Sequence, residues 1–290
     1  DVSKVDVVLL THGHLDHTGY LPRLVKEGFK GKILATEPTL SIARIILLDS
    51  AKIQEEQANK ANEEGYSKHP VALPFYNLEE AENTLKLFSG LKKDEWIILS
   101  KNIKFKFQFN GHIIGSTFIH LEIFEKVFIF SGDVGRLNDE LLAPPERPKW
   151  ADYLFLESTY GNKLHPEENI TEILKNLIEK TINDRGTLII PSFAVERLQL
   201  LMYLLWQMYK KNKIPNIPIF IDSPMGNNVL NVFQQYPDWH KLSMNEYEAI
   251  CNHFTIITSY ADTWTTIDDP RPKIVIAGSG MVTGGRVLTY

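Results

Sequence analysis

The amino-acid sequence predicts an α/β fold with two domains. Short apolar runs rich in β-branched residues alternate with segments in which apolar residues recur at helical spacing, which is typical of α/β proteins. The chain has 290 residues, at the upper limit for a single hydrophobic core, and this length favours two domains. Its 43% hydrophobic and 23% charged residues are ordinary for globular proteins and argue against a wholly disordered chain.

The first predicted elements are two strands and a long helix. Residues 5–10 form a nearly continuous apolar run, as expected of a buried strand, and residues 31–35 predict a second strand. Thr36 is a suitable N-cap for a helix that continues through a charged stretch to Gly65.

A capping box predicts the next helix, since Asn77 is followed three residues later by Glu80, and we expect this helix to stop near Gly90. In residues 104–109 phenylalanines alternate with polar residues, as in a half-exposed strand. Further strands are predicted at residues 119–123, 127–130 and 153–156. We place the domain boundary near Gly161, which gives domains over residues 1–161 and 162–290.

The second predicted domain is a smaller parallel α/β layer. An amphipathic helix begins at Ile170, and strands are expected at residues 187–190, 217–221 and 273–277. A helix over residues 195–210 separates the first two of these strands, as parallel connections require.

Charge and cysteine content exclude several classes of protein. With 31 basic and 36 acidic residues the formal charge is −5, which argues against a nucleic-acid coat of dispersed positive charge but leaves a local basic cleft open. The single cysteine, Cys251, cannot form an internal disulfide and predicts a reducing compartment, the cytoplasm.

No apolar run approaches the roughly 18–20 residues of a membrane-spanning helix, so we expect no membrane association.

Histidines gather in the segment THGHLDH at residues 11–17, directly after the first predicted strand. Three of the nine histidines fall within six residues, beside a carboxylate. Imidazole and carboxylate suit zinc and similar ions. We expect His12 and His14 to face one ion, and Asp16 and His17 a second. A polar loop that is rich in histidine by chance is the disfavoured alternative.

Three other candidates, His112, Asp133 and Glu157, each follow a predicted strand. Gly111 and Gly115 flank His112 and allow the backbone to turn sharply. Taken singly these residues are weak evidence, because such positions are commonly turns. Their shared location is stronger evidence, since α/β folds gather functional groups at the carboxyl ends of strands.

These motifs resemble those of the metallo-β-lactamase superfamily. Residues 12–17 (HGHLDH), 111–116 (GHIIGS) and 131–133 (SGD) look like its successive metal motifs, and residues 157–161 (ESTYG) resemble the acidic motif that opens the β-CASP insertion of its nucleic-acid-processing branch. Similar to segments of that insertion are PSFAVER, DSPM and SGMVTGGR, at residues 191–197, 222–225 and 279–286. The resemblance covers essentially the whole chain, and is strongest to prokaryotic relatives of the nuclease subunit of the pre-mRNA 3′-end cleavage machinery.

The resemblance implies an αββα metallo-β-lactamase sandwich with an inserted parallel β-CASP domain. It also implies that two zinc ions activate a hydroxide that cleaves a phosphodiester of single-stranded RNA. His12, His14 and His112 would hold the first zinc, Asp16 and His17 would contribute to the second, and Asp133 would bridge both.

Asp16 and Glu157 are the predicted catalytic carboxylates, with Glu157 orienting the site rather than binding metal. Substrate phosphates would be bound by Ser223, Ser279, Arg197 and Arg286. A structural ion pair is the alternative role for either arginine.

The resemblance also implies segments that the sequence does not contain. Family members have strands before the first metal motif and further histidines after the insertion. We therefore expect a sandwich incomplete at the N-terminus, a β-CASP domain incomplete at the C-terminus, and a second metal site short of a ligand.

Two other functions remain alternatives. One is a small-molecule thioester or lactam hydrolase on the same metal core, and the other is an inactive paralogue that binds RNA or protein. Endonuclease or 5′ exonuclease action, RNA or DNA as substrate, zinc or manganese, and monomer or homodimer are left open by the sequence.

Overall fold

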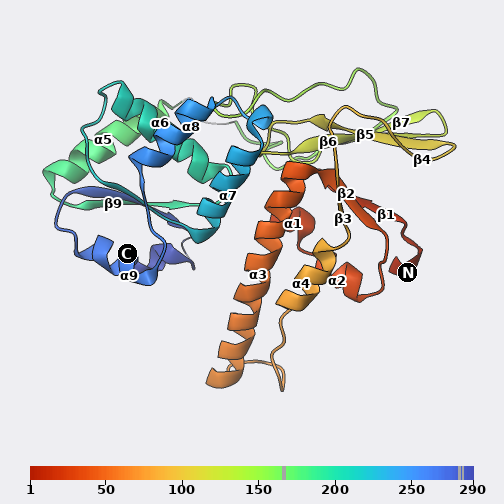
Figure 1. Ribbon diagram of the computed structural model, residues 1–290, viewed down its shortest axis with the longest axis horizontal. Coiled ribbons are helices and arrows are strands. Elements are labelled where there is room, and N and C mark those ends of the chain that lie inside the picture. The colour runs from red at the N-terminus through yellow and green to blue at the C-terminus, as the bar shows by residue number, and fades with distance from the viewer. Residues whose placement is uncertain (165–167, 280–281, 283) are drawn as a thin grey trace. The chain divides into compact units, whose positions relative to one another are not determined.

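The computed structural model describes residues 1–164, 168–279, 282 and 284–290, and Gly280, Met281 and Thr283 of the SGMVTGGR motif lie outside the described residues. The chain divides into two units, Asp1–Thr159 and Tyr160–Tyr290 (Figure 1). Within the described residues, no helix is long and apolar enough to cross a membrane.

A three-stranded parallel sheet begins the first unit. Its strands β1 (Val7–Leu9), β2 (Lys32–Thr36) and β3 (Phe88–Leu91) lie in the order β1-β2-β3. The helices of this unit are α1 (Leu15–Thr18), α2 (Leu21–Lys26), α3 (Glu37–Glu64) and α4 (Leu78–Leu85), and a 3-10 turn covers Val2–Lys4. Figure 1 shows α2, α3 and α4 together beside this sheet.

A five-stranded sheet completes the first unit, in the order β4-β5-β6-β7-β8. Its strands are β4 (Ile97–Ser100), β5 (Ile103–Phe109), β6 (Thr117–Ile123), β7 (Lys126–Phe130) and β8 (Tyr153–Phe155). The first four strands pair antiparallel, whereas β8 runs parallel to β7.

Two hydrophobic cores hold these layers together. One lies between the helices and the three-stranded sheet and includes Phe29, Ile33 and Leu47. The other joins the two sheets, because Leu34 of β2 packs with Phe105 and Phe107 of β5. Among its described residues, the first unit thus has one helical layer and two sheets of the expected sandwich. The phenylalanines of β5 are buried, as their alternation with polar residues predicts for one face of a half-exposed strand.

The second unit is built on a four-stranded, fully parallel sheet with helices on both sides (Figure 1). The strand order is β11-β10-β12-β9, with β9 (Thr187–Ser192), β10 (Ile219–Asp222), β11 (Thr255–Ile256) and β12 (Lys273–Gly278). Its helices are α5 (Ile170–Asn183), α6 (Arg197–Lys210), α7 (Pro224–Gln235), α8 (Met244–His253) and α9 (Tyr260–Asp268), with 3-10 turns at Pro237–Trp239 and Arg286–Thr289. The predicted α/β class is confirmed.

The structure corrects two local details. The predicted capping box at Asn77 and Glu80 is present, but α4 ends at Leu85 and the next residues enter β3, so the helix does not reach Gly90. Thr36 is at the N-cap position of α3, yet its hydroxyl makes no capping hydrogen bond. It donates instead to the carbonyl of Gly115, 79 residues away in the sequence, at 2.7 Å.

Candidate metal centre

The first histidines of the site lie in the tight loop between β1 and α1. His12 is fully buried, and His14 occupies the N-cap position of the one-turn helix that carries Asp16 and His17. A side chain at Gly13 would place its Cβ 2.7 Å from Ile42 Cγ2, so the loop can lie this close to α3 only with glycine there.

The loop after β5 carries His112 between two glycines in the left-handed region, Gly111 (φ 69°) and Gly115 (φ 84°). The Ser116 hydroxyl accepts hydrogen bonds from the N–H groups of His112 and Ile113, at 3.0 and 3.1 Å. These bonds fold the loop back on itself and present the imidazole of His112.

Asp133 follows β7, after Gly132 with a φ of 56°. The next residue, Val134, donates its N–H to Glu157 Oε1 at 2.8 Å, while Glu157 Oε2 accepts from the N–H of Thr159 at 3.2 Å. Burial raises the pKa of the Glu157 carboxyl, but these hydrogen bonds outweigh it and hold the pKa below its ordinary value. Glu157 is therefore an ionised side chain tied to the segment that carries Asp133.

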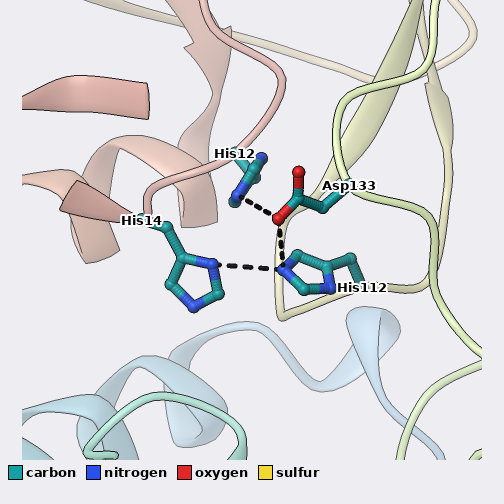
Figure 2. Close-up of side chains that lie close together, drawn as sticks. All are labelled: His12, His14, His112 and Asp133. Atoms are coloured by element: carbon teal, nitrogen blue, oxygen red, sulfur yellow. Dashed lines mark hydrogen bonds and ion pairs between the residues drawn. The ribbon is translucent and has the colours of Figure 1, made fainter. Parts of the chain in front are cut away.

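Four side chains from these three loops converge (Figure 2). His14 Nδ1 lies 3.1 Å from His112 Nε2, and Asp133 Oδ2 lies 3.3 Å from His112 Nε2 and 3.8 Å from His12 Nε2. Their ligand atoms all lie within 4.8 Å of one another.

A second group shares Asp133. His17 Nε2 lies 3.3 Å from Asp133 Oδ1 and 3.5 Å from Asp16 Oδ2. The two oxygens of Asp133 thus face different groups. Oδ2 lies toward His12 and His112, and Oδ1 lies toward His17. Such an arrangement allows one carboxylate to contact two ions.

These donors fit a metal ion. A tetrahedral zinc bound at about 2.0–2.1 Å holds its ligand nitrogens about 3.3 Å apart, close to the spacings in the first group. Among the described residues, His12 Nε2 is buried and has no hydrogen-bond partner, although it points at the carboxylate of Asp133 (Figure 2). A buried nitrogen without a hydrogen bond is costly unless a metal takes the lone pair.

The electrostatics of the site also favour a cation. Burial, followed by the neighbouring histidines, lowers the pKa of His12 to about 2, and burial and His112 lower that of His14 to about 4. Burial likewise lowers the pKa of His112, against the opposing effect of Asp133. The three imidazoles are therefore neutral near pH 7, which is the form that binds metal.

The four residues predicted to bind substrate lie in the second unit. Ser223 is buried at the N-cap of α7, where its Oγ accepts from the N–H of Gly226 at 3.2 Å, and Arg197 is the exposed first residue of α6. The hydroxyl of Ser279 donates to the carbonyl of Gly284 at 2.9 Å.

Arg286 is engaged within its own unit. Its Nε lies 3.5 Å from Oδ1 of the fully buried Asp222, and its guanidinium stacks on the Tyr260 ring at 3.6 Å. Oδ2 of Asp222 accepts from the hydroxyls of Thr263 and Tyr290, at 2.7 and 3.0 Å. Sequence reasoning missed Asp222 as a charged partner, although its place directly before Ser223 at a strand end was visible.

Comparison with known proteins agrees with this arrangement. Residues 1–183 match the sequence model of the Metallo-beta-lactamase superfamily, and residues 198–290 match that of the Beta-Casp domain. The chain belongs to the β-CASP branch of the metallo-β-lactamase superfamily.

Several curated relatives carry nuclease or RNA-related names. The chain is 33% identical to Ribonuclease TTHA0252 of Thermus thermophilus over 100% of this chain and 64% of that protein. It is 31% identical to Endoribonuclease YSH1 of Candida glabrata, over 98% and 37%, and 28% identical to Transcription termination factor FttA of Methanosarcina mazei, over 100% and 45%. The chain thus spans less than two thirds of the length of these β-CASP relatives.

Proposed function

We propose that the protein is a metal-dependent phosphodiester hydrolase that cleaves single-stranded RNA, with two zinc ions as cofactors. The observation that carries this proposal is that the two carboxylate oxygens of Asp133 face different histidines. Oδ2 lies 3.3 Å from His112 Nε2, and Oδ1 lies 3.3 Å from His17 Nε2. The names of the ribonuclease relatives support RNA as the substrate.

In this proposal each metal-binding side chain keeps the place it has in the structure. His12, His14 and His112 hold the first ion, Asp16 and His17 contribute to the second, and Asp133 contacts both. Bound zinc lowers the pKa of a water molecule to about 7 and offsets the negative charge of a phosphate.

The remaining residues orient the reacting groups. Glu157 fixes the backbone beside Asp133, so that the two carboxylate oxygens keep their separate directions. Asp16 has 76% of its side chain exposed, so its carboxylate lies at the solvent side of the site, where it can contact a substrate.

For the RNA backbone we propose Ser223 and Ser279, which directly follow the parallel strands β10 and β12, Arg197, which begins the helix after β9, and Arg286. The single cysteine fits a cytoplasmic enzyme.

The test uses the full-length protein with single-stranded RNA labelled at either end, matched DNA and a chromogenic lactam. We expect cleavage of RNA that chelator abolishes and zinc or manganese restores. The labelled ends separate endonuclease from 5′ exonuclease products. Chelator-insensitive cleavage, no cleavage, or lactam turnover far above that of RNA would refute the proposal.

A variant of the shared carboxylate sharpens this test. Asp133→Asn should still bind RNA but lose cleavage by at least about 100-fold, because the amide cannot contact two cations as a carboxylate does. Asp94→Asn removes a carboxylate from an exposed turn of the same unit and should cleave like the unmodified protein. Equal activity of the two variants would contradict the role of Asp133.

A further inference from the structure

Asn110 is a buried polar residue between β5 and the loop that carries His112. Only 1% of its surface is exposed, and it follows the phenylalanine-rich strand directly. Its backbone is fixed from both directions, since its N–H donates to the carbonyl of Ser116 at 3.3 Å and its carbonyl accepts from the N–H of Gly135 at 2.9 Å.

The side-chain amide of Asn110 joins two of the loops that form the candidate metal centre. Its Nδ2 donates to the carbonyls of Ser131 and Asp133, both at 2.9 Å. Its Oδ1 accepts from the N–H of His112 at 3.3 Å. Both amide donors and the amide acceptor therefore contact backbone groups of these loops.

This bridge links two loops that leave strands which do not pair with each other. His112 follows β5 and Asp133 follows β7, and β6 lies between these strands in the sheet. The sheet ladder therefore does not fix the distance between the two loops directly. The Asn110 amide spans that gap at the point where His112 Nε2 and Asp133 Oδ2 must come within 3.3 Å.

We propose that Asn110 is a positioning residue that sets the spacing of His112 and Asp133, and through that spacing the affinity of the first metal ion. The inference rests on the metal-binding part of the proposed function and does not depend on the substrate.

The chemistry of the amide makes the requirement specific. Aspartate would set a carboxylate against the carbonyl oxygens of Ser131 and Asp133, and alanine would leave these two carbonyls without their amide donor. Either change removes hydrogen bonds between the two loops. Because these groups are buried, water cannot take the place of the lost bonds without a cost in free energy.

The experiment measures metal binding rather than catalysis. Full-length protein carrying Asn110→Ala or Asn110→Asp is stripped with chelator and titrated with Co²⁺ by visible absorption and with Zn²⁺ by competition. A His17→Ala background isolates the first ion, because His17 belongs to the second group. Asn102→Ala and Asn102→Asp, at an exposed position of the same unit, are the matched controls.

We expect the Asn110 variants to bind the first ion about 10–100-fold more weakly, as is typical when a group that orients metal ligands is lost. The cobalt absorption should also change in shape, since the geometry of the ligands changes. The Asn102 variants should bind metal like the unmodified protein.

Dissociation constants within about threefold of the control, with far-ultraviolet circular dichroism unchanged, would overturn the inference. So would a loss of the fold in both Asn110 variants, because Asn110 would then act on folding as a whole. An unmodified protein that binds metal but does not cleave RNA refutes the proposed substrate and leaves the role of Asn110 intact.

Discussion

Gly115 anchors the His112 loop on the first turn of α3, and replacing it with alanine should separate the two. Its carbonyl accepts hydrogen bonds from the hydroxyls of Thr36 and Thr39, both at 2.7 Å and both buried. Its φ is 84°, and an added Cβ would lie 2.4 Å from the backbone nitrogen of Thr39 and 2.9 Å from the carbonyl carbon of Pro38. Because both neighbours are backbone atoms at a helix start, the loop must move.

The size of the effect follows from these contacts. The left-handed backbone costs about 1–2 kcal/mol for a residue with a Cβ. Displacing the loop also removes two buried hydrogen bonds worth about 1 kcal/mol each. We therefore expect Gly115→Ala to lower the free energy of unfolding by roughly 3–4 kcal/mol.

Gly65→Ala is the matched control. Gly65 also has a positive φ, 69°, at the C-cap of α3, but an added Cβ meets nothing within 4 Å there. Gly65→Ala should therefore lower the free energy of unfolding only by the cost of a left-handed backbone, about 1–2 kcal/mol.

The assay is urea unfolding of the full-length, chelated protein, followed by circular dichroism. Gly115→Ala should unfold at a clearly lower urea concentration than Gly65→Ala, and should also bind zinc more weakly because His112 moves with the loop. Equal midpoints for the two variants would refute the argument that the loop is anchored through Gly115.

Three further predictions concern charge and metal. Burial lowers the pKa of His12 to about 2 and of His14 to about 4, so below pH 6.5 the unfolded chain binds protons that the folded, metal-free chain does not. Its unfolding free energy should therefore fall with pH from about 6.5 toward 4, by up to about 1.4 kcal/mol per pH unit for each histidine. His17→Ala should reduce the bound zinc from two ions to one, measured by native mass spectrometry. Thr263→Val should lower the unfolding free energy by about 1–3 kcal/mol, because Asp222 loses its 2.7 Å donor while remaining fully buried.

Each of these predictions has a contrary outcome that is easy to observe. Metal-free stability that stays flat between pH 7 and 5 would contradict the buried neutral histidines. Retention of two ions by His17→Ala, compared with His69→Ala at an exposed position, would contradict the second group. Thr265→Val, on the exposed side of the same helix, should cost less than Thr263→Val, and an equal cost would contradict the argument.

Local patterns in the sequence were sufficient for most helices and strands. The Asn77 capping box is formed by residues three apart, and the alternation of phenylalanine with polar residues marks the two faces of β5, so both elements could be predicted from short stretches of sequence. The end of α4 could not, because residues 88–91 form a strand by pairing with β2. Pairing of this kind depends on a distant segment.

The sequence by itself determined which chemical groups begin the candidate metal centre, because HGHLDH places imidazoles and carboxylate within six consecutive residues. Only the tertiary structure decided how the distant donors meet them. Thr36 was expected to cap its own helix, but its hydroxyl donates to the carbonyl of Gly115. The side-chain amide of Asn110 joins the His112 and Asp133 loops. Burial decides these distant partners, because it leaves few groups within reach and makes an unpaired polar group costly.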